Sequence, residues 1–260
     1  MSEIVKTEAI VLKAIKYRES SKIVTYFTKE HGKLSAIIKG ARSSKQMFGT
    51  ALEPMSRVSL VVYEKKGREI QTVTQCEVIR QQRNLFYNLE KMLVGMSIIE
   101  LVRNIAHEQE KNVPLFELIA TTLSEVNDAT RNPLNLFYSF EISLADILGF
   151  GLSFEHCVWC EGKVDVHRTT DNKIEYHLEK GGPLCEKCNT LQGKKFALSM
   201  PALKILQFLA NEKEVRKKVN LVIYKKQGLE IESFLFTYLR LHVTGVRSLK
   251  SMQALKNTLG

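Results

Sequence analysis

Four of the five cysteines form two Cys-x-x-Cys pairs, and these residues have the types and spacing that chemistry requires. Cys157 and Cys160 make the first pair, Cys185 and Cys188 make the second, and 24 residues separate the pairs. Four thiolates brought together in this way complete the tetrahedral coordination of zinc and leave no position for a catalytic water. We therefore predict one structural Zn²⁺. Two disulfides, or four unrelated thiols, are the alternatives.

Short strands and turns must position the two pairs. Residues 164–167 and 173–178 have strand-like patterns, and Gly181-Gly182-Pro183 turns the chain back toward the second pair. These segments indicate a small metal module at residues 153–195. Such a module fixes the placement of its neighbours and does not by itself indicate their function.

The composition is that of an ordinary globular protein. Of the 260 residues, 44% are hydrophobic and 25% are charged, which allows two domains and a small module. Met1–Lys6 lacks the pattern of a signal peptide, and every apolar run is far shorter than the roughly 20 residues of a membrane helix. We expect a cytoplasmic protein without a membrane partner.

The charge distribution indicates a polyanionic partner. The net charge is +10, and nucleic acid suits it better than a membrane surface does. Residues 31–68 hold eight Lys/Arg and two Glu, and residues 194–226 hold nine and two. Each basic segment alone is compatible with a solvated surface, but two of them on either side of a more acidic centre favour binding.

Residues 4–80 have the alternating pattern of β-strands. Five such segments, with one longer connection between the third and the fourth, predict an OB-fold barrel. From Asn84 onward, apolar residues recur with the helical period of 3.6. The predicted fold class is thus α+β, with an OB-fold domain at 1–80 and a helical domain at 81–152 and 196–260 that carries the metal module as an insertion.

The longer connection, residues 40–49, has the composition of a nucleic-acid-binding loop. It contains Arg42, Lys45 and Phe48 but no acidic residue, so it offers cations to phosphates and a ring to a base. From charge and location we add Lys33 on the preceding strand. In the alternative, the loop is merely polar and Phe48 folds back into the barrel core.

Known catalytic motifs are missing from the sequence. It contains no phosphate-binding Gly-x-x-x-x-Gly-Lys loop, no Gly-x-Ser-x-Gly elbow and no His-Glu-x-x-His pair. The acidic residues show no close pair after a strand that would hold two metal ions. We expect a binding protein, not an enzyme.

The order of these parts resembles the RecO family of bacterial recombination mediators over essentially the full length. Beside the two cysteine pairs, the resemblance rests on Thr28-Lys-Glu-His-Gly32, Lys39-Gly-Ala-Arg42, Leu52-Glu-Pro54, Leu148-Gly149 and Arg247-Ser-Leu-Lys-Ser251. Lys39 and Arg42 match the basic loop motif of the family. Some members have lost the cysteines, whereas this chain keeps all four.

The resemblance implies a function that the composition alone does not. Members of the family bind single- and double-stranded DNA, anneal complementary strands and help load RecA during DNA repair. Their partners are RecR and the C-terminal tail of single-strand-binding protein, and RecA is reached indirectly, so the resemblance implies association with the nucleoid. Two alternatives from other classes are a zinc-ribbon RNA-binding factor in transcription or translation, and a scaffold whose basic surfaces meet an acidic protein.

Overall fold

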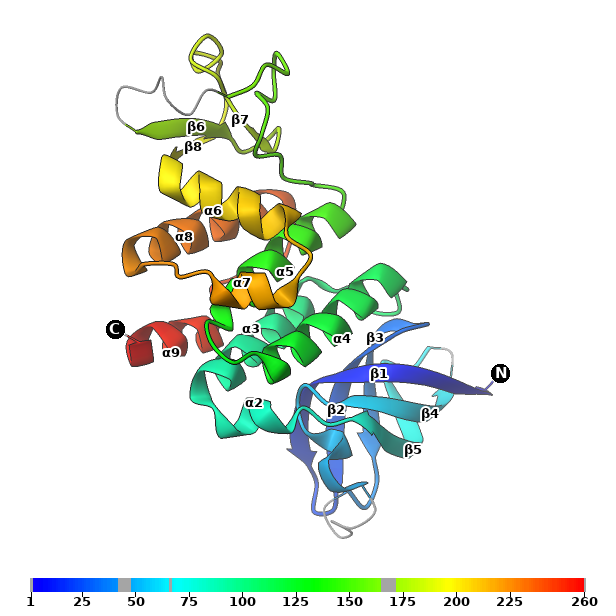
Figure 1. The fold of residues 1–260 in the computed structure, drawn as a ribbon. Helices are drawn as coiled ribbons and strands as arrows, with labels where there is room; N and C mark the ends of the chain where they lie inside the picture. The colour runs from blue at the N-terminus through cyan, green and yellow to red at the C-terminus, as the bar shows by residue number, and fades with distance from the viewer. Residues whose placement is uncertain (1, 42–47, 66, 165–171, 260) are drawn as a thin grey trace. The chain divides into compact units, whose positions relative to one another are not determined.

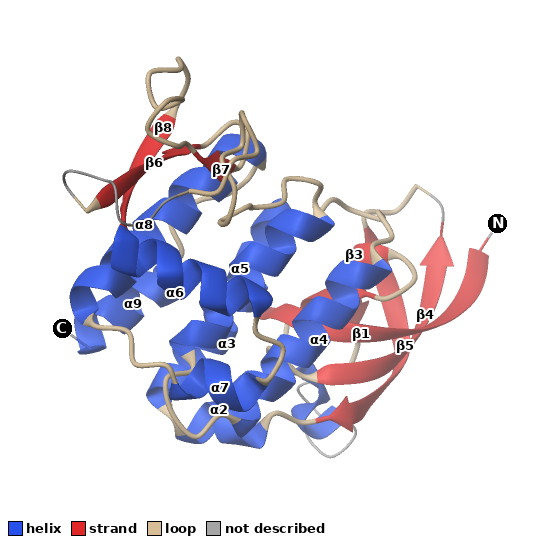
Figure 2. Ribbon diagram, turned by 45° about the horizontal axis from the view of Figure 1, so that its top comes forward, coloured by secondary structure: helices blue, strands red, loops and turns tan. Residues whose placement is uncertain are grey.

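The computed structural model describes residues 2–41, 48–65, 67–164 and 172–259. The chain divides into two compact units. Unit 1 comprises Met1–Asp128 together with Ser248–Gly260, and unit 2 comprises Ala129–Arg247. Figure 2 shows the strands of unit 1 gathered in one barrel and a smaller group of strands in unit 2.

The barrel of unit 1 is the OB-fold that the sequence predicts (Figure 1). Its strands are β1 (Ser2–Tyr17), β2 (Ser21–Thr28), β3 (Gly32–Ile38), β4 (Arg57–Lys65) and β5 (Ile70–Arg80). They close in the order β1-β2-β3-β5-β4, with β3 and β5 parallel and the other neighbours antiparallel.

Strand β1 closes the barrel because it is long enough to pair with two partners. Its first half, up to Ile10, lies against β4, and its second half, from Ala9 onward, lies against β2. The pairing with β2 shifts register at Leu12, and such a bulge bends a strand and increases its twist. The bend lets one strand follow the curvature of a closed sheet.

The barrel interior is filled by alternate residues of each strand. Its buried side chains include Val24, Tyr26, Leu34, Ala36, Ile38, Val58, Leu60, Val62 and Val73. The short helix η1 (Gly49–Leu52) adds Ala51 and Leu52 to the same cluster. Because each large aliphatic side chain contributes about 1.5–3 kcal/mol when fully buried, this period-two pattern is sufficient to set the strand register.

Besides η1, the described residues of unit 1 form four α-helices. They are α2 (Arg83–Tyr87), α3 (Leu89–Ile105), α4 (Val113–Asp128) and α9 (Lys250–Leu259). Helix α3 begins where the Asn88 side chain accepts a hydrogen bond from the Lys91 amide. Its apolar residues recur at helical spacing, and Val94, Ile98 and Val102 are buried, as the change of period at Asn84 predicts.

Helix α9 returns to unit 1 after the whole of unit 2 and packs against α3. The Glu100 carboxylate of α3 accepts hydrogen bonds from the backbone amides of Lys250 and Ser251 and from the Ser251 hydroxyl. An acidic side chain therefore caps α9 from a neighbouring helix and favourably meets its N-terminal dipole.

The described residues of unit 2 form four helices and a small sheet. They are α5 (Leu134–Ile147), α6 (Met200–Asn211), α7 (Val215–Asn220) and α8 (Lys225–His242), with β6 (Lys173–His177), β7 (Gly182–Pro183) and β8 (Lys195–Ser199). The sheet order is β7-β6-β8. Tyr176 of β6 makes edge contacts with Phe234 and Tyr238 of α8, so aromatic packing fixes the sheet on the helices.

The two units cut across the helical segments 81–152 and 196–260 that the sequence suggests. Helices α2–α4 and α9 group with the barrel, whereas α5–α8 group with the metal module. Along the described residues, every helix is too short or too polar to span a bilayer.

Candidate metal centre and candidate nucleic-acid interface

Two tight turns hold the four cysteines of unit 2. In the first, the Cys157 carbonyl accepts a hydrogen bond from the Glu161 amide at 2.9 Å, and the Cys157 amide donates to the Gly162 carbonyl at 2.8 Å. In the second, the Cys188 amide donates to the Cys185 carbonyl at 2.9 Å. The backbone of each turn therefore sets the direction of its two thiols.

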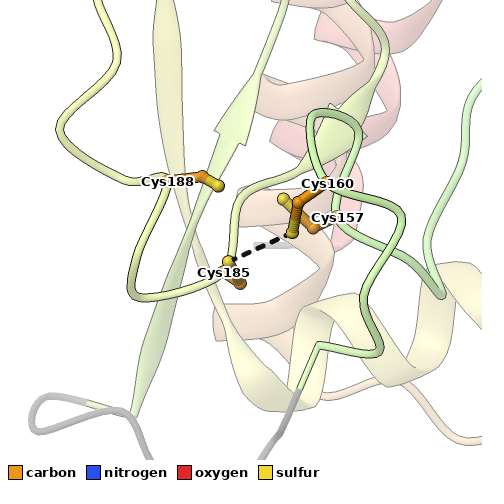
Figure 3. A group of neighbouring side chains, drawn as sticks. All are labelled: Cys157, Cys160, Cys185 and Cys188. Atoms are coloured by element: carbon orange, nitrogen blue, oxygen red, sulfur yellow. Dashed lines mark hydrogen bonds between the residues drawn. The ribbon is translucent and has the colours of Figure 1, made fainter.

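The four sulfur atoms form one cluster (Figure 3). All Sγ atoms lie within 4.8 Å of one another, and those of Cys160 and Cys185 are 3.7 Å apart. A tetrahedron with metal–sulfur bonds of 2.3 Å places its sulfurs about 3.8 Å apart, whereas a disulfide requires about 2.05 Å. The cysteines are free thiols. This geometry suits a metal ion and does not match the disulfide alternative.

Within the cluster, the thiols of Cys157 and Cys188 differ in acidity. Burial disfavours the Cys157 thiolate, but backbone N–H groups of Cys185, Cys160 and Trp159 outweigh burial and lower the Cys157 pKa to about 6. Partial burial and the adjacent thiols raise the pKa of Cys188 to about 12. Since four crowded thiolates repel one another, a divalent cation would release protons and stabilise all four together.

The first cysteine turn is hydrogen-bonded to the sheet beside it. The Val158 amide donates to the Pro183 carbonyl at 2.9 Å, which joins the first turn to β7. Next to it, Trp159 is 55% exposed, and the Lys180 ammonium lies 4.8 Å from the centre of its ring. A metal ion held here would fix the first turn, the second turn and β7 as one body.

The predicted loop after β3 is described only in part. Lys39 is exposed at the end of β3, and Arg42 and Lys45 lie outside the described residues. Phe48 is 8% exposed and belongs to the barrel core together with Ala51 and other residues of that cluster. The prediction that Phe48 stacks on a base is therefore corrected. Burial of its ring in the apolar core is favourable, and Phe48 adopts the alternative in which it folds back into the barrel.

Lys33 participates in a contact within unit 1. Its Nζ lies 3.3 Å from Oε1 of Glu108, and its side chain is 17% exposed. The Gln109 amide also donates to the Lys33 carbonyl at 3.0 Å. The connection between α3 and α4 thus covers the start of β3, where β5 does not reach. Gly32 is required there, because a Cβ atom would stand 2.0 Å from the Glu110 carbonyl oxygen.

The outer face of β1, β2 and β3 carries a row of isoleucines, continued by a threonine of β5, that the sequence alone did not reveal. Register pairs Ile15 with Ile23, Ile23 with Ile37, and Ile37 with Thr72, so these four side chains cross the sheet in line. Ile15 is 45% exposed. We call this surface the barrel face. The sequence signal for this surface was that apolar residues occur on both faces of β1 between residues 9 and 17.

Basic residues border the barrel face. Arg18 in the β1–β2 loop places its guanidinium 5.3 Å from the centre of the Tyr17 ring. Arg68 in the β4–β5 loop lines an open cavity of 510 Å³ together with Ile70 and Gln71. Glu69 and Glu108 also line it, so this end is of mixed charge. OB-folds bind oligonucleotides on the face of their second and third strands and through these two loops.

Comparisons with known proteins give a consistent result over both units. Residues 1–82 match the family model "Recombination protein O N terminal", and residues 87–253 match "Recombination protein O C terminal". The DNA repair protein RecO of Chloroherpeton thalassium is 31% identical over 251 residues, which cover 95% of this chain and 96% of the relative. That of Thermoanaerobacter sp. is 32% identical over 243 residues, covering 88% and 94%.

Proposed function

The chain belongs to the RecO family, and we propose from this premise that it acts in DNA repair as a DNA-binding protein that anneals complementary single strands. It also helps to load the recombinase onto strands coated by single-strand-binding protein. The proposed partners are single- and double-stranded DNA, RecR, the C-terminal tail of single-strand-binding protein and, indirectly, RecA. Family membership supports these partners and a location at the nucleoid in the cytoplasm.

The barrel face is the single observation that best supports strand binding. Its apolar row offers surface to bases, while Lys13, Arg18 and Lys39 are exposed beside it and offer charge to phosphates. Tyr17, 36% exposed at the end of β1, adds an aromatic ring. Such a surface contacts every nucleotide through the same groups, so we expect little sequence preference.

We propose Zn²⁺ as the resident ion of the cysteine cluster. Soft thiolates in a tetrahedral set favour zinc over harder cations, and four protein ligands indicate a structural site. Cys157, Cys160, Cys185 and Cys188 would hold it. The ion then stabilises unit 2 and takes no direct part in annealing.

Annealing requires screening of the repulsion between two strands, not bond-making chemistry. A net charge of +10 supplies that screening without a nucleotide, and the sequence contains no nucleotide-binding loop. We expect annealing without ATP or Mg²⁺, and we expect salt to reduce the contribution of the protein because it screens the same charges.

The decisive experiment measures the annealing rate of complementary strands, naked and coated by the cognate single-strand-binding protein, with and without ATP. Acceleration on both substrates without ATP supports the proposal. Strict dependence on ATP, or no acceleration on either substrate, contradicts it.

A further inference from the structure

The connection between α7 and α8 lies in unit 2 (Figure 1). It exposes apolar side chains among lysines. Val222 is 63% exposed, Tyr224 is 74% exposed, and Leu229 in the first turns of α8 is 48% exposed. Lys225 and Lys226 follow Tyr224 directly and are exposed as well. We call these five residues the Tyr224 surface.

Two asparagine side chains anchor the backbone at the start of this connection. The buried Asn135 side chain donates from Nδ2 to the carbonyls of Lys218, at 2.8 Å, and Leu221, at 2.9 Å. Asn132 donates in the same way to Val219, at 2.9 Å, and to Leu221, at 3.2 Å. Four hydrogen bonds from Asn132 and Asn135 thus anchor the backbone of residues 218–221, immediately before the exposed residues. Anchoring on this side reduces the ordering that binding would cost.

The charge of the segment is strongly positive. Residues 213–229 contain six Lys/Arg and one Glu. Lys217 is already paired with Glu212 and Glu214. Lys225 and Lys226 stand in the first turn of α8, which has no acidic residue. Positive charge at that end of a helix opposes the helix dipole and lowers stability. Lys225 and Lys226 therefore do not stabilise the helix in which they lie, which is compatible with a role in binding.

An exposed ring followed directly in the chain by two exposed lysines suits one ligand chemistry best. Single-stranded nucleic acid offers an unpaired base to stack on an aromatic ring and phosphates to neighbouring lysines. The apolar side chain of an acidic peptide would instead need a socket, and a ring that is 74% exposed presents its faces to solvent. We propose that the Tyr224 surface binds single-stranded nucleic acid, with one base stacked on Tyr224 and the backbone held by Lys225 and Lys226.

The inference rests on the proposed function, since it assigns a strand-binding surface to unit 2 in addition to the barrel face of unit 1. Annealing needs two strands held by one protein. A stacking surface on unit 2 would supply contacts for a strand that the barrel face does not occupy.

The test compares oligo(dT) with an abasic oligonucleotide of equal length, which keeps the phosphates and lacks the bases. Tyr224→Ala should lower the affinity for oligo(dT) about fivefold or more, because stacking on one base is worth at least ~1 kcal/mol. Its affinity for the abasic strand should be unchanged. Tyr224→Phe should bind oligo(dT) like the unsubstituted chain, because the ring remains. Lys225→Ala with Lys226→Ala should weaken both ligands equally.

Tyr87→Ala is the matched control, since Tyr87 is 87% exposed on α2 of unit 1 and should not affect either ligand. If the unsubstituted chain binds no oligonucleotide, the proposed function itself fails. If it binds and Tyr224→Ala binds oligo(dT) equally well, only this inference fails. Equal losses on both strands, or a Phe variant as weak as the Ala variant, also overturn stacking. Selective loss of an acidic, apolar peptide would assign the surface to a protein partner and overturn the inference.

Discussion

The ammonium group of Lys33 and the carboxylate of Glu108 form an ion pair of 3.3 Å that fastens the start of β3 to the connection between α3 and α4. The backbones of the same two residues also form an isolated parallel β-bridge. Lys33 therefore has a structural partner in addition to the DNA contact that the sequence suggests.

Exchanging the two charges separates these roles. Lys33→Glu should lower the free energy of unfolding by about 0.5–1 kcal/mol, because a half-exposed pair is worth no more than that and like charges then repel. Lys33→Glu with Glu108→Lys should recover most of the loss in urea denaturation. If Lys33 also contacts DNA, the exchanged variant will be stable yet weak in DNA binding. A double variant no more stable than the single one would contradict the ion pair.

Charge reversal at the two loops of the barrel face should weaken DNA binding. For Arg18→Glu with Arg68→Glu, the slope of log K against log salt on single strands should become shallower by about 1.4, because each lost phosphate contact removes about 0.7. The matched control is Arg83→Glu with Arg240→Glu, which makes the same charge change at exposed helical positions. An equal effect of both double variants would show that net charge, not the barrel face, governs binding.

The loop after β3 is tested in the same titration. Arg42→Glu with Lys45→Glu should lower the affinity several-fold if these residues reach phosphates, as the sequence predicts. Unchanged binding by a folded variant would move the phosphate contacts to the basic segment 194–226.

Metal analysis of protein purified without chelator should find one zinc per chain. Cys157→Ser should abolish it, while Cys76→Ala, which removes the cysteine outside the cluster, should retain it. If the lost ligand contributes ~3 kcal/mol, the melting temperature of the Ser variant should fall by roughly 6–12 °C. Well under one zinc in the unsubstituted protein would contradict the site.

Chelation offers an optical measurement of the same site. Trp159, the only tryptophan of the chain, lies within the first cysteine pair. Removal of the metal should shift its fluorescence as the turn loosens, and added Zn²⁺ should restore the original spectrum. An unchanged spectrum during complete loss of the metal would show that the turn does not depend on the ion.

Glu141 should make the stability of unit 2 depend on pH. It is 5% exposed, its Oε2 has no hydrogen-bond partner among the described residues, and burial, with a smaller contribution from Glu232, raises its pKa well above the ordinary value. The folded state thus binds a proton that the unfolded state has already lost above about pH 4.5. The contribution of Glu141 to stability is therefore greatest below that pH, and it falls as pH rises toward the folded pKa, by about 1.4 kcal/mol per unit.

Glu141→Gln should remove this dependence and stabilise the protein near pH 8, because the amide is neutral at every pH. Denaturation curves at pH 5 and pH 8 measure the difference. Glu117→Gln, at an exposed carboxylate paired with Lys29, serves as the control. Identical pH profiles for the Glu141 variant and the unsubstituted protein would contradict a buried, protonated carboxyl group.

The sequence was sufficient to predict those parts of the fold that local pattern determines. Alternation of apolar residues predicts the five strands, the helical period after Asn84 predicts α3, and the spacing of Cys157 to Cys188 predicts the cluster. Each of these signals arises from neighbours within a few residues or from a distinctive side chain, so a linear reading can recover it.

Features that depend on distant pairing were not predictable in this way. The row from Ile15 to Thr72 exists only because three strand registers bring its members into line. Phe48 has an aromatic ring that could stack on a base, and it lies in a basic loop, yet burial in the barrel decides its position. The cap of α9 by Glu100 spans 150 positions along the chain, and its short sequence context gives no hint of the partner.

The return of α9 to α3 also means that unit 1 is joined across the whole of unit 2. Unit 2 is one continuous stretch, whereas unit 1 is built from two separate stretches of the chain. Met252 and Leu255 of α9 are buried, and α9 packs against α3, so the side of α3 that receives them is covered only by the second stretch. A truncation after Arg247 would therefore keep every residue of unit 2 and leave unit 1 incomplete.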